Sequence, residues 1–270
     1  MKEYFISEID IEKLYHLSDI KIKLDSNKRQ HLLLTGKNGS GKTSLLLAIE
    51  KFLRAINDEK LSQVFDQYPT WINEAKKKVL SASSDSEKYA ADKDLKQCLG
   101  FLKKYSDGVQ INLNQYEGLE MMYHNGKFIT AYFPSERKAQ FMRPNGVENI
   151  TLENTYGIDE SAGDILLKYM VHLKTQQAYA RNEGDQTTAD KIQQWFDRFD
   201  SALQILLDEE SIHIEYDYKK YDFKIRQNGR EPFSFHELSD GYSSVIYIVS
   251  DLILRMDKNW LLADKISEYD

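Results

Sequence analysis

Residues 36–43 read Gly-Lys-Asn-Gly-Ser-Gly-Lys-Thr, and this spacing predicts a loop that wraps around phosphate groups. Its glycines let successive backbone N–H groups curl around an anionic oxygen, where a Cβ atom would obstruct the turn. Lys42 would reach the β- and γ-phosphates of a nucleotide, and the Thr43 hydroxyl would ligate Mg²⁺. The alternative is a chance match in a glycine-containing loop, and the flanking sequence argues against it.

The residues on either side of this loop have the patterns of a strand and a helix. Residues 30–35, Gln-His-Leu-Leu-Leu-Thr, read as a short buried strand, and residues 42–57 place apolar side chains at helical spacing. A strand, a glycine-rich turn and a helix in this order predict the α/β fold of a P-loop nucleoside triphosphatase. The helix would add its unpaired amides and the positive end of its dipole. The predicted nucleotide-binding residues are Gly36, Lys37, Asn38, Gly39, Ser40, Gly41, Lys42, Thr43 and Ser44, with Thr43 as the metal ligand.

Composition narrows the class of protein. The formal charge of −7 over 270 residues argues against a generally basic, DNA-binding protein and leaves room only for a local basic patch. A single cysteine, Cys98, excludes an internal disulfide and fits a reducing compartment, so we expect a cytoplasmic protein. The chain has no apolar run long enough to cross a bilayer, and we expect no membrane partner. The histidines show no metal-ligand spacing, which argues against zinc chemistry.

The remaining sequence divides into segments of different pattern. Alternating runs at 4–9 and 20–24 predict a hairpin, which places a nucleotide-binding core at 1–57. Residues 58–106 predict a helical lobe with a serine-rich loop at 81–86. The segment 107–137 predicts β-strands at 109–113, 119–123 and 127–133, the last two joined by an Asn125-Gly126 turn. The segment 158–208 predicts an antiparallel helical hairpin, because its apolar stripes are too short for a coiled coil.

A second motif lies in the segment 211–257, after strands predicted at 212–216 and 221–225. Residues 236–244 read His-Glu-Leu-Ser-Asp-Gly-Tyr-Ser-Ser and precede a predicted helix. Leu-Ser-x-Gly alone is a weak signal, and an ordinary helix N-terminus capped by Ser239 or Asp240 is the alternative. Even so, such an N-terminus is a second place where an anion can bind. The stripe expected to be buried on this helix is Val245, Ile248, Val249, Leu252 and Met256.

The order of these segments resembles that of ABC-type ATPases. It is most similar to the group containing SMC, RecF and the overcoming-lysogenisation-defect (OLD) ATPases, and within it to stand-alone bacterial members of phage-defence operons. Their signature commonly reads Leu-Ser-Asp-Gly. Transporter cassettes usually read Leu-Ser-Gly-Gly-Gln, from which Asp240 and Tyr242 depart. The resemblance covers most of the chain, but its specific residues are confined to 36–43 and 238–244. It implies an ABC-ATPase head with a mixed sheet, an N-terminal hairpin and an inserted helical lobe.

The resemblance also implies a mechanism and partners. Ser239 and the amide of Gly241 would contact the γ-phosphate of an ATP held by another subunit, so two Mg²⁺-ATP would lie between the subunits of a head-to-tail dimer. ATP binding and hydrolysis would then regulate an effector, such as a nuclease in antiviral defence. Arg137, within the stretch 130–138, resembles the arginine of a loop near the nucleotide. Many relatives place a glutamine loop in this region; no obvious glutamine has that role here, and Gln140 is a candidate. A solvated surface loop is the alternative for this stretch.

One expected motif is missing. Relatives carry an apolar strand ending in Asp-Glu after the signature helix, and these carboxylates hold Mg²⁺ and polarise the attacking water. Residues 261–264, Leu-Leu-Ala-Asp, are a poor version of it, so the catalytic residues stay unidentified. We therefore expect an incomplete ATPase domain that binds nucleotide but hydrolyses it poorly. Two other functions stay open: a DNA-repair or chromosome-maintenance ATPase that binds DNA, and a monomeric P-loop kinase, which would not need residues 238–244.

Overall fold

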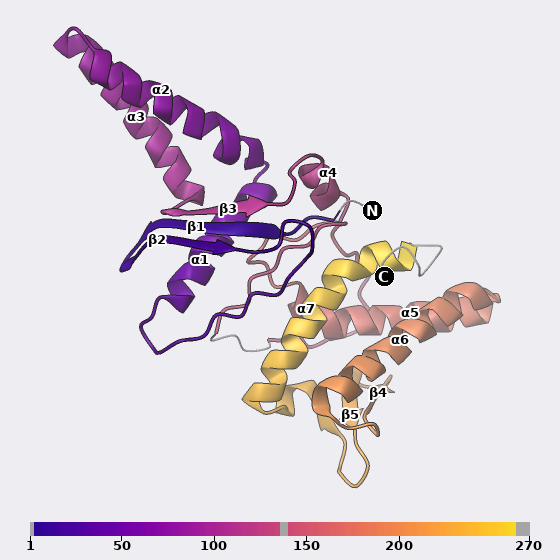
Figure 1. Ribbon diagram of the computed structural model, residues 1–270. Coiled ribbons are helices and arrows are strands. Elements are labelled where there is room, and N and C mark those ends of the chain that lie inside the picture. The colour runs from indigo at the N-terminus through magenta and orange to yellow at the C-terminus, as the bar shows by residue number, and fades with distance from the viewer. Residues whose placement is uncertain (1–2, 136–139, 263–270) are drawn as a thin grey trace. The chain divides into compact units, whose positions relative to one another are not determined.

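The computed structural model describes residues 3–135 and 140–262. The chain forms two compact units, Met1–Thr130 and Ala131–Asp270 (Figure 1). Each unit combines helices with a small sheet, so the predicted mixture of α and β structure is confirmed.

The first unit is built on a three-stranded antiparallel sheet in the order β2-β1-β3, from β1 (Ile6–Leu14), β2 (Leu17–Lys23) and β3 (Val109–Leu113). β1 and β2 form the predicted hairpin, and the central β1 also pairs with β3. Helix α1 (Lys42–Asn57) spans the range predicted from its apolar spacing. The buried side chains of α1 pack with those of β1 and β3, which fixes the start of the helix beside the sheet.

A helical arm extends from this sheet (Figure 1). It consists of a π-helical turn η1 (Gln63–Gln67), α2 (Tyr68–Ser81) and α3 (Asp85–Tyr105). α2 and α3 pack side by side, as the prediction of a helical lobe required. The predicted serine-rich break is also confirmed, because the Ser84 hydroxyl accepts a hydrogen bond from the Glu87 N–H and caps α3.

The predicted strand at residues 30–35 does not form. This segment has no strand pairing, and Leu33 is 83% exposed. A strand needs a neighbour for its backbone N–H and C=O groups. Both edges of β1 are already occupied by β2 and β3, and residues 30–35 join neither outer strand. The prediction of a short buried strand at residues 30–35 is therefore wrong.

The predicted hairpin around Asn125-Gly126 is also wrong, and β3 is the only strand among the described residues of 107–135. Residues 119–124 form the short helix α4 (Leu119–His124), which buries Leu119 and Tyr123 on one face. These side chains are four positions apart, a spacing that suits a helix. The Asn125-Gly126 pair ends this helix, since the Gly126 N–H donates to the Tyr123 carbonyl.

The second unit contains a helical hairpin, a small sheet and a long C-terminal helix. Its elements are η2 (Ala162–Ile165), α5 (Leu166–Glu183), α6 (Gln186–Leu207), β4 (His213–Asp217), β5 (Asp222–Arg226), β6 (Phe233–Ser234), η3 (Phe235–Glu237) and α7 (Asp240–Leu262). The predicted hairpin of α5 and α6 is confirmed, and both predicted apolar stripes are buried in one core. The sheet, ordered β4-β5-β6, is antiparallel. Because both described sheets are antiparallel throughout, the predicted mixed sheet is not seen in the described residues.

Helix α7 buries a different face from the one predicted. Val245 is 39% and Met256 45% exposed, whereas the polar side chains Ser250, Asp251, Arg255 and Asp257 are buried. The burial of the charged pair is explained by its partners: Arg255 forms an ion pair with Asp251 and also donates to nearby backbone carbonyls. Hydrophobicity alone therefore selected the wrong face of this helix.

Candidate phosphate-binding site

The predicted loop forms a tight turn at the start of α1. Gly41 is the N-cap residue and has φ 90°, in the left-handed region that favours glycine. A Cβ atom at this position would lie 2.9 Å from Cδ1 of Leu17 on β2. The backbone conformation thus favours glycine here, and a side chain would also require the end of the Leu17 side chain to move.

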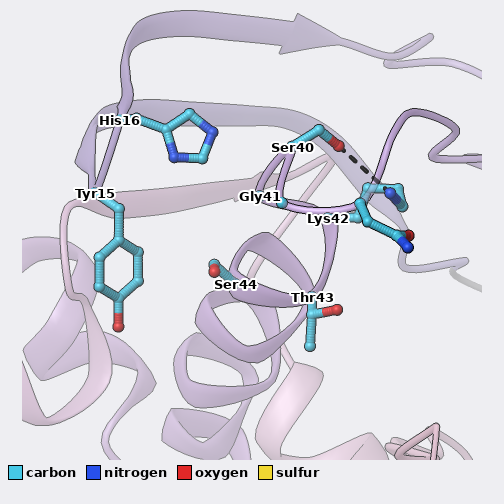
Figure 2. A pocket seen from close by; sticks show the side chains of 9 residues that line it. Tyr15, His16, Ser40, Gly41, Lys42, Thr43 and Ser44 are labelled. Carbon is cyan, nitrogen blue, oxygen red and sulfur yellow. Dashed lines mark hydrogen bonds between the residues drawn. The ribbon is translucent and has the colours of Figure 1, made fainter.

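The Lys42 side chain lies inside this loop and is hydrogen-bonded to it. Its Nζ donates to the carbonyl oxygens of Gly36 at 2.7 Å and Lys37 at 2.8 Å. It also lies 3.4 Å from the Ser40 hydroxyl oxygen (Figure 2). The ammonium group is therefore held by neutral backbone acceptors of the loop itself. Because hydrogen bonds to anionic oxygens are stronger than those to neutral ones, a phosphate group would compete well for this cation.

The N-terminus of α1 offers donors for the same anion. The first turn of this fully described helix carries no acidic side chain, and Gly41 provides no side-chain cap. The first amides of a helix have no intrahelical partner and carry the positive end of the helix dipole. Residues 36–40 and Thr43 are exposed, so a ligand can reach these donors.

The loop lines a pocket of about 580 Å³, within the ~300–1,000 Å³ typical of small-molecule sites. Its wall contains Asn38, Gly39, Ser40, Gly41, Lys42, Thr43 and Ser44, which the sequence predicted. Two further residues, Tyr15 and His16, come from the turn between β1 and β2 (Figure 2). Tyr15 is 78% exposed, so its ring is available to a ligand.

Sequence reasoning missed Tyr15 and His16. The alternating runs on either side indicate a turn at this position, and the register pairs Leu14 with Leu17, which leaves these two residues at its tip. Nothing in the sequence shows that this tip lies beside residues 36–44. That neighbourhood follows from the packing of α1 against the sheet.

The other predicted site residues lie in the second unit or outside the described residues. Ser239 and Gly241 are together at the N-terminus of α7, both exposed, and the Ser239 carbonyl accepts from the Ser243 N–H at 2.8 Å. The structure therefore brings residues 36–44 together in one unit and the Ser-Gly pair together in the other. Arg137 and Asp264 lie outside the described residues.

Gln140 lines a smaller pocket of about 260 Å³ in the second unit. The carboxylates of Asp159, Glu160 and Asp164 belong to the same wall. Burial raises the pKa of the Asp164 carboxyl, and the nearby Asp251 adds to this effect. The pocket is acidic, which is unfavourable for a phosphate group.

A comparison with protein-family models, curated proteins and solved structures finds no match to this chain. In residues 3–135 and 140–262, no group of three or more His, Cys, Asp or Glu side chains is arranged to hold a metal ion. No helix in this part of the chain is long and apolar enough to cross a membrane.

Proposed function

We propose that the chain binds Mg²⁺-ATP at residues 36–44 and works as an ABC-type P-loop ATPase. The observation that supports this best is the position of Lys42, whose ammonium group lies inside the loop next to the free N-terminus of α1. A cation, backbone donors and a helix dipole then act together on one anionic group. On nucleotide binding, the Lys42 ammonium group would leave the neutral carbonyl oxygens that now accept its hydrogen bonds and would donate to phosphate oxygens instead.

The pocket has suitable groups for the triphosphate, the Mg²⁺ ion and the base of the nucleotide. The triphosphate would lie over the loop, and the exposed Thr43 hydroxyl would supply one oxygen to Mg²⁺. Phosphate oxygens and water would complete the coordination, because Mg²⁺ commonly keeps several waters and takes few protein ligands. Tyr15 and His16 border the same pocket and offer ring faces for the base.

The Ser239–Gly241 turn supports a role in a dimer. It is an exposed helix N-terminus with a hydroxyl group, which suits contact with an anion supplied by another molecule. In the proposed head-to-tail dimer it covers the γ-phosphate that residues 36–44 of the second copy hold. Hydrolysis would remove the γ-phosphate that both subunits contact, and would therefore favour separation of the subunits. Regulation of an effector, such as a nuclease in antiviral defence, rests on the sequence resemblance.

The nucleotide site is tested by calorimetric titration of Mg²⁺-ATP into the wild type and the Lys42→Ala variant. We expect at least a tenfold loss of affinity, since a hydrogen bond to a charged group is worth about 1.5–3 kcal/mol. Lys23→Ala is the matched control, because Lys23 is an exposed lysine of β2 and does not line the pocket. Equal affinity in the wild type and Lys42→Ala would refute the proposal.

The dimer is tested by sedimentation velocity with and without ATP. Ser239→Arg should abolish ATP-dependent dimerisation and leave nucleotide binding intact. If Ser239→Arg still dimerises, Ser239 does not belong to the interface. The proposal for the nucleotide site would not be affected by that result. A wild type that binds ATP, stays monomeric and phosphorylates a small acceptor would instead be a kinase.

A further inference from the structure

The first unit contains a second cavity, separate from the phosphate-binding pocket. It has a volume of about 320 Å³ and shares no residue with the pocket around Lys42. Its walls are mainly apolar and come from Leu61, Phe65, Tyr116 and Met121. Met121 is 62% exposed, so one wall of the cavity borders on solvent.

The cavity wall includes one acidic side chain, Glu120. The Oε1 atom of this side chain is buried. Within the described residues, this oxygen has no hydrogen-bond partner. Leaving a buried carboxylate oxygen without a donor is costly, so such an atom needs an explanation. A cation beside this carboxylate would offset the cost of burying part of its charge.

The local backbone and the aromatic side chains support a binding role. The π-helical turn η1 carries Phe65 into the cavity wall, and π-helical turns are rare and often lie at functional sites. The rings of Phe65 and Tyr116 are 4.2 Å apart between centroids, and Phe65 also contacts Phe52 at 4.9 Å. Aromatic surface beside a carboxylate is the combination that binds organic cations, because both attract positive charge.

We infer that this cavity binds an organic ammonium ion with a short apolar body. The ammonium group lies beside the Glu120 carboxylate, and the apolar body packs against Phe65, Tyr116 and Leu61. A free amine and a lysine side chain of a partner share this chemistry. The inference is independent of the proposed ATPase activity, since none of these residues contributes to the phosphate-binding pocket.

The test is a titration of the full chain with two ammonium probes and one neutral control. 2-Phenylethylammonium represents a free amine, Nα-acetyl-lysine methylamide represents a peptide lysine, and 2-phenylethanol has nearly the shape of the first without its charge. Saturable binding of at least one ammonium probe, at least tenfold tighter than 2-phenylethanol, is expected. The tighter of the two probes identifies the source of the ligand.

Two variants assign the binding to this cavity. Glu120→Gln keeps the volume but removes the charge, and should weaken ammonium binding at least tenfold. Met121→Ala shortens an exposed wall and should weaken it several-fold through lost apolar contact. Glu74→Gln, on the exposed surface of α2, is the control and should leave the affinity unchanged. The inference is overturned if neither probe binds saturably, if 2-phenylethanol binds as tightly, or if Glu120→Gln binds like the wild type.

Discussion

Replacing Arg255 by Met should be among the most destabilising single changes in the second unit. The Arg255 side chain is 2% and the Asp251 side chain 1% exposed, and the two form an ion pair one helical turn apart on α7. Arg255 also donates to the carbonyl oxygens of Gly157, at 3.0 Å, and Glu160. Methionine preserves the apolar stem but removes every one of these donors.

The size of the stability loss follows from the buried charge that Asp251 keeps after Arg255 is replaced. Asp251 stays buried with its charge and keeps the Gly163 N–H, at 3.0 Å, as a donor. Removing one partner of a buried ion pair costs about 3–5 kcal/mol, because the other charge is left without compensation. Whole domains are stable by only about 5–15 kcal/mol, so the Arg255→Met variant should lose about a fifth or more of its stability. The double variant Arg255→Met/Asp251→Asn should recover part of this loss.

The measurement is urea unfolding followed by the fluorescence of Trp195, which is buried in the core of the second unit. Trp71, in the first unit, is replaced by Phe so that the signal reports on the second unit. Trp260 is also replaced by Phe, so that Trp195 is the one tryptophan left in the chain. The matched control is Arg226→Met, which breaks an exposed ion pair with Glu215 between β4 and β5 and should cost far less. A loss below about 1 kcal/mol for Arg255→Met, or a double variant less stable than this single one, would refute the reasoning.

Three other substitutions give distinct expected outcomes. Gly41→Ala forces a left-handed conformation and a contact with Leu17, so it should cost about 1–2 kcal/mol in thermal unfolding and weaken Mg²⁺-ATP binding. Burial raises the pKa of the Asp257 carboxyl to about 6, so the folded state binds its proton more tightly than the unfolded chain does. The stability from this group should therefore be complete near pH 4 and fall by about 3 kcal/mol as the pH rises past 6, and Asp257→Asn should remove that slope from urea unfolding curves. Ser84→Ala removes the hydroxyl that accepts from the Glu87 N–H, and faster amide exchange in the first turn of α3 should report a loss of about 1 kcal/mol.

The sequence was a good guide where local chemistry decides the structure. The glycines of residues 36–41 and the apolar spacing of 42–57 predicted the loop and α1 because turn geometry and helical period are local properties. The stripes of α5 and α6 were predicted for the same reason, since each helix packs its apolar face into one core.

Prediction failed where the outcome depends on distant partners. Residues 30–35 look like a strand, but a strand exists only where a neighbouring edge is free, and that depends on how β1, β2 and β3 pair. The buried face of α7 depends on carbonyl groups of residues 157 and 160, far away in sequence. Tyr15 and His16 reach the candidate phosphate-binding pocket only through the packing of the hairpin.

The arm of α2 and α3 has a mechanical consequence for the first unit. α3 contains 21 residues and is therefore about 30 Å long. At its base, the Tyr68 and Phe101 rings stack at 3.9 Å, and the Tyr105 hydroxyl donates to Asp58, immediately after α1. A tilt of about 10° there would carry the far end through about 5 Å, given that length. A change at the end of α1 that tilted the arm by this amount would therefore be measurable with a spectroscopic label at its far end.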